Sequence, residues 1–489
     1  MRAIYFAIAL ATAPAAASAQ VANTLLPPPA APGPIDQKLL RTAAPIVALI
    51  HARIIDGTGG PVLQDRTVVI DHGKIASILP VPPPAGAEII DATGKTVLPG
   101  IIGMHNHMYY IARPDLDAAL HKEPPLLVPQ MTYSAPRLYL AGGVTTMRTT
   151  GSVEPYADLN MKRQIDAGAL PGPHMDVTAP YLEGANSVFI QMYQLKDADD
   201  ARQTVAYWAD RGATSFKAYM NITRAELAAA IDEAHKRHLK ITGHLCSITY
   251  PEAVALGIDD LEHGFMVNTQ LDTGKQPDIC SKSAGADTLE KMDPASPEAA
   301  ALIRQLVAAH VAITSTLPVF EPLQGDALTP PQALLDALAP QARTALQSIL
   351  AAKRFNPTPK ELTIYAHATA LEKAFSEAGG LLIAGPDPTG LGNVVPGFSD
   401  HREIELLVRA GFSPLQAIRI ATMNGAIYLG VQDRIGSVET GKNADLIVVD
   451  GDPSAHIADI EHVAIVFKDG VGYDPAKLLA SVRGDYGLY

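Results

Sequence analysis

The chain shows two different patterns of hydrophobic and polar positions. Near both ends, short hydrophobic runs are separated by Asp-Gly, His-Gly and proline-rich turns, a pattern typical of β-strands. These runs lie at 46–50, 67–70, 74–78 and 89–90, and again at 434–438, 445–450 and 462–467. Between them, hydrophobic runs alternate with segments of helical periodicity. We therefore expect the two ends to pair with each other in one small β-sandwich domain around a different central domain.

The central pattern predicts eight strands. They are expected at 97–107, 144–149, 174–179, 214–219, 240–245, 260–264, 312–317 and 381–387. One intervening helix begins with the capping box Thr223-Arg-Ala-Glu226. Eight strands that alternate with helices indicate an α/β fold, the TIM-like (β/α)8 barrel, whose active site lies at the carboxyl ends of its strands. The stretches 268–297 and 318–359 are longer than simple connections between a strand and a helix, so we expect them to cover the carboxyl ends of the strands.

The N-terminal residues are typical of a cleavable export signal. Arg2 is followed by an apolar run and by the small residues Ala17-Ser18-Ala19. An uncleaved anchor fits less well, because the run is shorter than the roughly 20 residues that span a bilayer. The expected organisation is a signal at 1–19, a proline-rich linker at 20–45, the first part of the sandwich at 46–96, the barrel at 97–430, and the second part with the C-terminal tail at 431–489. The mature protein is expected to be periplasmic or secreted.

Composition narrows the partners. With 47% hydrophobic and 18% charged residues, the 489-residue chain has ample material for a core. The net charge of −13 argues against a nucleic-acid-binding surface. No run after the signal predicts a membrane span, and the sequence leaves a homo-oligomer open. Two cysteines, Cys246 and Cys280, exclude a zinc site of four thiolates but leave one disulfide open.

Six side chains of metal-ligating or convertible type fall at predicted strand ends. His105 and His107 are two residues apart on the first strand, so both imidazoles can face the same ion. The others end the fourth, fifth, sixth and eighth strands: Lys217, His244, His263 and Asp387. Any one histidine alone is more often a packed core residue. The convergence of all six on the catalytic end predicts a metal site.

Lys217 has two interpretations. A buried lysine of lowered pKa can react with CO2, and the resulting carbamate can bridge two metal ions as a carboxylate does. Alternatively, its ammonium holds a substrate carboxylate or a structural acid. Spacing alone leaves both open.

The motifs resemble the amidohydrolase superfamily, in particular the branch with imidazolonepropionase-like proteins, metal-dependent Xaa-Pro and Xaa-Arg dipeptidases and ochratoxin amidases. The resemblance covers about residues 46–470 and implies a composite β-sandwich around a metal-bearing barrel. The motifs are Leu98-Pro-Gly-Ile-Ile-Gly-Met-His-Asn-His107, Phe216-Lys217-Ala218-Tyr219, Thr242-Gly-His244, Leu261-Glu-His263-Gly264, Ala384-Gly-Pro-Asp387, Ala421-Thr-Met-Asn424 and Ile435-Gly-Ser-Val-Glu-Thr-Gly441-Lys-Asn-Ala-Asp445.

The resemblance also implies roles. His105, His107 and Asp387 would bind one divalent metal ion, His244 and His263 a second, and carboxylated Lys217 would bridge the two, with zinc expected. Tyr219 would lie near the substrate carbonyl, although a packed aromatic residue is an equal alternative. His401 and Glu403 match an element after the eighth strand and are interpreted as groups that orient ligands or fix loops. Arg148-Thr149 departs from relatives that place Asp after this Arg.

The expected reaction is hydrolysis of a C–N bond in a small amide or peptide, such as a dipeptide or N-acyl amino acid. Metal ions would activate a water, and Asp387 would take its proton and pass it to the leaving nitrogen. The alternative enzyme is a cyclic-amide hydrolase or deaminase of the imidazolonepropionase-like type. A non-catalytic binding protein is disfavoured because all six groups are intact. A substrate carboxylate would be bound by Arg148, His174 or Tyr219.

Overall fold

The computed structural model describes residues 24–33, 37–80, 82–112, 128–187, 189, 191–325, 329–351, 356–389 and 394–488. The signal expected at 1–19 lies outside the described residues. Within the described part of the chain, no helix is long and apolar enough to cross a bilayer.

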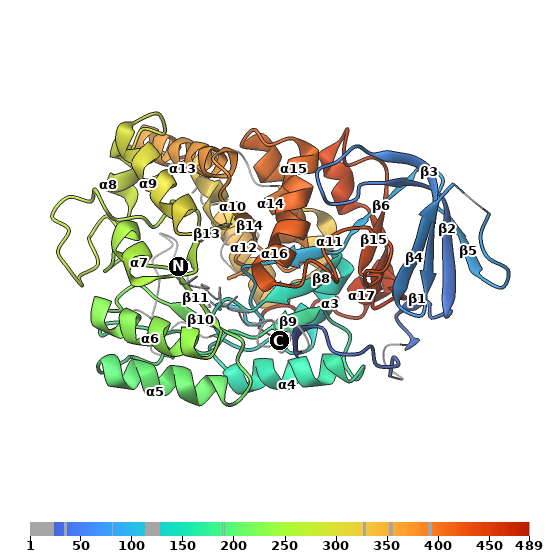
Figure 1. Ribbon diagram of the computed structural model, residues 1–489, viewed down its shortest axis with the longest axis horizontal. Helices are drawn as coiled ribbons and strands as arrows, with labels where there is room; N and C mark the ends of the chain where they lie inside the picture. The colour runs from blue at the N-terminus through green and yellow to red at the C-terminus, as the bar shows by residue number, and fades with distance from the viewer. Residues whose placement is uncertain are drawn as a thin grey trace, which may run out of the picture.

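One nine-stranded sheet is built from both ends of the chain (Figure 1). Its order is β1-β17-β16-β15-β6-β2-β3-β4, with β5 paired to β2. The N-terminal strands are β1 (Leu40–Thr42), β2 (Ile46–Ile54), β3 (Leu63–Asp71), β4 (Lys74–Leu79), β5 (Glu88–Asp91) and β6 (Lys95–Pro99), and the C-terminal strands are β15 (Leu446–Asp450), β16 (Val463–Lys468) and β17 (Val471–Tyr473). We call this the end sheet. Its strand pairing matches the expected meeting of the two ends; a two-layered sandwich stays a prediction.

The end sheet reaches into the segment expected to be a linker. β1 pairs with β17, Leu40 opposite Tyr473, although it lies within 20–45. Leu25 and Leu26 are also buried, against the barrel residues Ile102 and Met104. Proline-rich composition therefore did not prevent this segment from packing, because its apolar side chains found an existing core.

Eight parallel strands follow in the predicted order. β7 (Ile101–Gly103), β8 (Val144–Arg148) and β9 (His174–Asp176) form one sheet, and β10 (Ser215–Ala218), β11 (Lys240–Gly243), β12 (Asp260–Glu262), β13 (Ala312–Ser315) and β14 (Leu382–Ala384) form another. Backbone hydrogen bonds link the sheets at both edges: Ala179 N–H donates to Ser215 at 3.0 Å, and Met104 N–H donates to Ala384 at 2.8 Å. This sequential order is that of a TIM-barrel-type α/β fold.

The first predicted strand, 97–107, is divided in the structure. Its N-terminal part is β6 of the end sheet, paired with β15, and only β7 belongs to the parallel strands. The chain crosses between the two at Gly100, where an added Cβ would lie 2.1 Å from Thr145 Oγ1. One continuous hydrophobic run in the sequence therefore contributes strands to two different sheets.

Helices surround the parallel strands (Figure 1). The capping box at Thr223 is present on α6. The segments expected to be long coverings carry helices of their own, with α8 in the first and most of α10, together with α11 and α12, in the second. The helices are α3 (Ser134–Ala141), α4 (Pro155–Asp166), α5 (Ala198–Ala209), α6 (Arg224–Lys236), α7 (Tyr250–Leu256), α8 (Ala286–Lys291), α9 (Pro297–Ala308), α10 (Leu317–Phe320), α11 (Gln332–Ala337), α12 (Pro340–Ala351), α13 (Pro359–Glu377), α14 (Phe398–Arg409), α15 (Pro414–Arg419), α16 (Gly425–Leu429) and α17 (Pro475–Ala480).

Candidate metal centre

The six residues expected to form the centre lie together at the carboxyl ends of the parallel strands. His107 Nε2 lies 3.0 Å and His105 Nε2 lies 3.4 Å from Asp387 Oδ1. Lys217 Nζ lies 3.1 Å from His105 Nε2. The ring of His263 lies 4.7 Å from that of His105 and 4.5 Å from that of His244. The structure thus brings all six side chains into one cluster.

Two of these residues adopt an unusual backbone conformation. His263 has φ 67° and Asp387 has φ 55°, the left-handed region that costs energy for residues other than glycine. Asp387 is fixed by its N–H, which donates to the His105 carbonyl at 3.0 Å. Gly385 permits this approach, because a Cβ there would lie 2.1 Å from His105 N. The Gly-Pro-Asp segment therefore turns the carboxylate toward the histidines.

Burial sets the protonation of the cluster. Burial lowers the pKa of His244 to about 3 and holds the pKa of His105, His107 and His263 below the usual value. Burial also lowers the pKa of Lys217 to about 8. Burial alone would raise the pKa of Asp387, but the nearby histidines and Lys217 hold it below its usual range. The cluster presents neutral imidazoles and an ionised carboxylate, the forms that bind metal ions.

The donor set fits a divalent metal ion. Ligand atoms of His105, His263 and Asp387 lie within 4.8 Å of one another. His263 Nδ1 is occupied by Thr316 Oγ1 at 2.9 Å, whereas its Nε2 is buried without a hydrogen-bond partner. Imidazole and carboxylate donors suit zinc and related ions.

Glu262 supports the centre from below, a role that the sequence analysis did not assign. Its Oε2 lies 2.6 Å from His105 Nδ1, and its Oε1 accepts from Thr242 Oγ1 at 2.6 Å. A carboxylate bound to the second ring nitrogen fixes the orientation of a ligand histidine. The signal in the sequence was an acidic residue inside a strand, directly before a candidate ligand.

Arg148 lies beneath the centre and does not line the cavity, so the expectation that it binds substrate needs correction. It is fully buried, and its Nη2 donates to Asp260 Oδ2 and Glu262 Oε1, both at 2.8 Å. Its Nε donates to the Met104 carbonyl at 2.8 Å. The guanidinium thus neutralises strand carboxylates and is not directed at the cavity.

His174 is also absent from the cavity. It is the first residue of β9 and therefore lies at the amino end of that strand, opposite the centre. Its Nε2 lies 3.2 Å from Asp469 and 3.9 Å from Asp445, which flank strands of the end sheet. Its expected contact with substrate is wrong because strand direction places it at the other end.

His401 and Glu403 lie on α14, outside the cluster. His401 Nε2 lies 2.7 Å from the Gly142 carbonyl, next to α3. Glu403 Oε2 accepts from the Leu317 N–H at 2.7 Å, at the start of α10. His401 thus contacts backbone between α3 and β8, and Glu403 contacts backbone at the junction of β13 and α10.

A cavity of about 370 Å³ opens onto the cluster. It is lined by His107, Lys217, His244, His263 and Asp387, and by the side chains Tyr109, Ile111, Val128, Val153, Tyr181, Phe189, Gln191, Met192, Tyr219, Met220, Val319, Phe320 and Thr389. Tyr219 lies beside the cluster, with its ring 4.9 Å from that of His244, and its contact with a substrate carbonyl stays a prediction.

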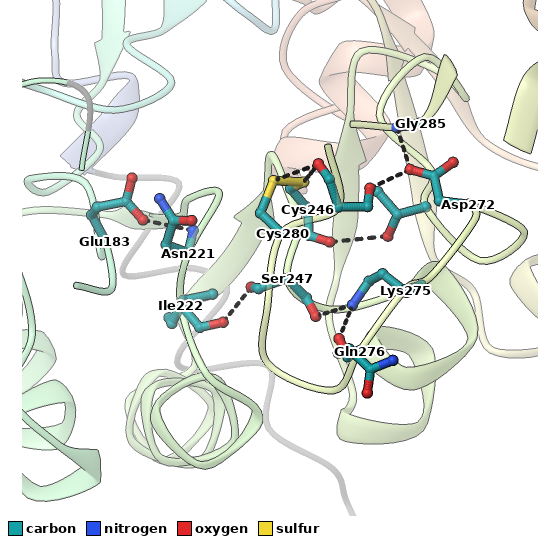
Figure 2. The surroundings of a disulfide bond; sticks show 12 residues. Glu183, Asn221, Ile222, Cys246, Ser247, Asp272, Lys275, Gln276, Cys280 and Gly285 are labelled. Atoms are coloured by element: carbon teal, nitrogen blue, oxygen red, sulfur yellow. Dashed lines mark hydrogen bonds between the residues drawn. A yellow bond between two sulfur atoms is a disulfide. The ribbon is translucent and has the colours of Figure 1, made fainter. Parts of the chain in front are cut away.

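A disulfide joins the segments that follow two of the histidines (Figure 2). Cys246, two residues after His244, is bonded to Cys280 in the loop beyond His263. Thr269 Oγ1 donates to the Cys246 carbonyl at 3.0 Å, and Lys275 Nζ donates to the Ser247 carbonyl at 2.6 Å. The bridge that the sequence left open is present and holds this loop against the end of β11.

Comparisons with known proteins agree with this architecture. An imidazolonepropionase of Micrococcus luteus is 51% identical over 43 residues, which are 9% of this chain and 11% of that protein, so the chain matches only about a tenth of this relative's length. A proposed prolidase from Bifidobacterium longum has a TM-score of 0.63 and 26% identity, covering 90% of this chain and 99% of that one. A Xaa-Pro dipeptidase with bound methionine has a TM-score of 0.65 and 20% identity, covering 88% and 100%.

The model of the amidohydrolase family matches residues 96–472, which include the parallel strands and the whole cluster. On this match, the chain belongs to the amidohydrolase family.

Proposed function

We propose that the protein is a metal-dependent hydrolase that cleaves the C–N bond of a small amide or peptide, such as a dipeptide or an N-acyl amino acid. The observation that carries the proposal is the cluster of four histidines, Lys217 and Asp387, all of which except His105 line one cavity large enough for a small molecule. Family membership supports hydrolysis of C–N bonds.

We further propose two divalent ions, with zinc expected. His105, His107 and Asp387 would hold one ion and His244 and His263 the other, with Lys217 carboxylated as the bridge. The lowered pKa of Lys217, to about 8, supports carbamate formation, because a neutral amine is needed to react with CO2. When bound, such ions supply a water of lowered pKa and polarise a carbonyl.

Asp387 is the proton carrier in this proposal. Its carboxylate is ionised and lies against His107 and His105, so it can accept a proton from the attacking water. Water adds to the carbonyl carbon, the C–N bond breaks, and the same proton goes to the departing nitrogen. Tyr219, whose ring lies beside that of His244, would contact the substrate carbonyl.

A second candidate is hydrolysis of a cyclic amide or deamination. The short match to imidazolonepropionase favours it. Metal stoichiometry separates deamination from the first proposal, because one ion per chain would favour a deaminase and two would favour the dinuclear hydrolase.

The test begins with the purified protein after dialysis. We expect elemental analysis to find close to two divalent ions per chain, and metal-loaded protein to release amines from a panel of dipeptides and N-acyl amino acids. Lys217→Ala should lose metal, and added short carboxylic acids should restore part of the activity. Full activity of Lys217→Arg would contradict the carbamate, since arginine cannot replace a bridging carboxylate.

Export is a separate proposal. N-terminal sequencing of the natively expressed protein should begin at Gln20 in the periplasmic or secreted fraction, and a cytoplasmic chain that retains Met1 would refute it.

A further inference from the structure

Aromatic rings stand next to three of the four histidines of the centre. The ring of Tyr109 stacks on His107 with centroids 4.5 Å apart. Tyr219 lies 4.9 Å from His244, and Phe320 of α10 lies 5.8 Å from His263. Part of the wall beside the centre is therefore aromatic.

The hydroxyl of Tyr109 already has a partner, the hydroxyl of the neighbouring Tyr181. The Tyr109 and Tyr181 hydroxyls are 2.5 Å apart and hydrogen-bonded to each other. The ring of Tyr181 in turn packs against that of Tyr219 at 5.0 Å. This wall offers ring surface more than free hydrogen-bonding groups, a surface suited to another aromatic or apolar group.

The charges of the cavity belong to the centre itself. Among the lining residues that the structure describes, Lys217 and Asp387 are the lysine and the carboxylate, and the pKa values of the three tyrosines are raised by burial, so their hydroxyls stay neutral. Arg148, expected to hold a substrate carboxylate, is paired with Asp260 and Glu262 below. A free carboxylate against the aromatic wall would lose its hydration without gaining a cationic partner from that wall.

The volume allows two flanking groups. A dry cavity of about 150 Å³ accommodates benzene. The cavity here, about 370 Å³, therefore has room for an amide with a ring-sized group and a further group of similar size.

Resting on the proposed function, we propose that the preferred substrates are neutral amides that carry an aromatic group next to the scissile bond, in place of free-carboxylate dipeptides. The aromatic group lies between Tyr109, Tyr219 and Phe320. This replaces the expectation from the sequence that Arg148, His174 or Tyr219 binds a substrate carboxylate.

Matched substrates test the proposal in the metal-loaded protein. N-benzoylglycinamide and N-acetylglycinamide differ only in the acyl group, and release of benzoate or acetate reports cleavage of the same bond. We expect kcat/KM to be at least about tenfold higher for the benzoyl compound, because its phenyl ring is transferred from water to the aromatic side chains of the cavity. N-benzoylglycine, which carries the free carboxylate, should be a poorer substrate than N-benzoylglycinamide.

Variants locate the effect. Phe320→Ala should reduce the benzoyl preference by about tenfold with little change for the acetyl compound. Phe320→Leu keeps an apolar side chain and guards against loss of folding; it should reduce the preference less. Tyr207→Ala removes a ring from the exposed surface of α5 and should leave the preference unchanged.

Binding measurements test the preference for an aromatic group without requiring hydrolysis. N-methylbenzamide should bind more tightly than N-methylacetamide by calorimetry, and Phe320→Ala should remove the difference. A preference for the acetyl compound or the free acid in a protein that hydrolyses the panel would overturn the substrate class alone. If no amide is hydrolysed although N-methylbenzamide binds, the proposed function fails, and so does the substrate proposal that rests on it.

Discussion

Two groups of histidine and aspartate lie at opposite ends of the parallel strands. The mouth group is His105, His263 and Asp387, and the base group is His174, Asp445 and Asp469. In each, the possible ligand atoms lie within 4.8 Å of one another and are largely buried. By residue type and proximity, both groups could hold a metal ion.

Their surroundings differ. Lys468 Nζ lies 3.1 Å from Asp469 Oδ2, so an ammonium already faces one of the two aspartates of the base group. The cavity beside it measures about 20 Å³, against about 370 Å³ at the mouth. The base group connects β9 with the chain next to β15 and β16, and it acts as a hydrogen-bonded joint between the barrel and the end sheet. Donor types alone therefore do not distinguish the two groups, whereas only the mouth group lies beside a cavity large enough for a small molecule.

The largest expected difference is in metal content. His263→Ala should lose at least one of the two proposed ions, whereas His174→Ala should keep both. Elemental analysis after dialysis against metal-free buffer measures this. Equal metal content in the two variants would contradict the assignment of the mouth group as the centre.

Catalysis should separate the two groups next. Asp387→Asn keeps the shape of the side chain but cannot accept the proton, so kcat should fall at least about 100-fold. Asp469→Asn should leave kcat unchanged. Metal content measured in parallel shows whether Asp387→Asn acts through the proton or through loss of the ions. An unchanged kcat with metal retained would move the proton transfer to another residue.

The free energy of unfolding should depend more on the base group than catalysis does. Asp469→Asn removes a buried charge from its hydrogen bonds with His174 and Lys468, and the free energy of unfolding should fall by about 2 kcal/mol. Denaturant unfolding of the metal-free protein measures it. Asp232→Asn, on an exposed ion pair of α6, is the matched control and should change little. A similar small change at Asp469 would mean that the joint carries no stability.

The smallest expected effect is a dependence of the free energy of unfolding on pH. Burial raises the pKa of Asp445 to about 6, above its value of about 3.9 in an unfolded chain. The folded chain then binds a proton that the unfolded chain does not, so this group's contribution to stability is lost as pH rises from about 4 through 6. Asp469 has a lowered pKa and acts in the opposite direction at lower pH. Asp445→Asn should flatten the decline between pH 4 and 6; an equal decline in the variant would assign it to other groups.

The sequence predicted strand ends well and strand directions less well. His105, His107, Lys217, His244, His263 and Asp387 were found because each follows a buried run, and carboxyl ends of parallel strands meet. His174 precedes its run, and treating it as a strand end ignored that order. The division of the first strand was hidden because a residue-by-residue pattern does not show which sheet a hydrophobic run joins.

Buried partners were harder to predict. Arg148 of β8 pairs with Asp260 and Glu262 of β12, a pairing that needs the spatial order of the strands. Whether Cys246 and Cys280 form a disulfide was open for the same reason. Local patterns show which side chains are buried, whereas the identity of their partners depends on contacts distant in the chain.

The Cys246–Cys280 bridge has a consequence for how this molecule is made. It closes a loop with a sequence separation of 34 that contains β12 and His263. Cross-linking a loop of this length limits the unfolded chain by about 3–4 kcal/mol in the chain-entropy view. Protein from a reducing cytoplasm and protein from an oxidising compartment are then covalently different molecules with one sequence. Oxidative folding decides which is obtained, so melting temperatures and metal contents from different hosts are comparable only after free thiols have been counted.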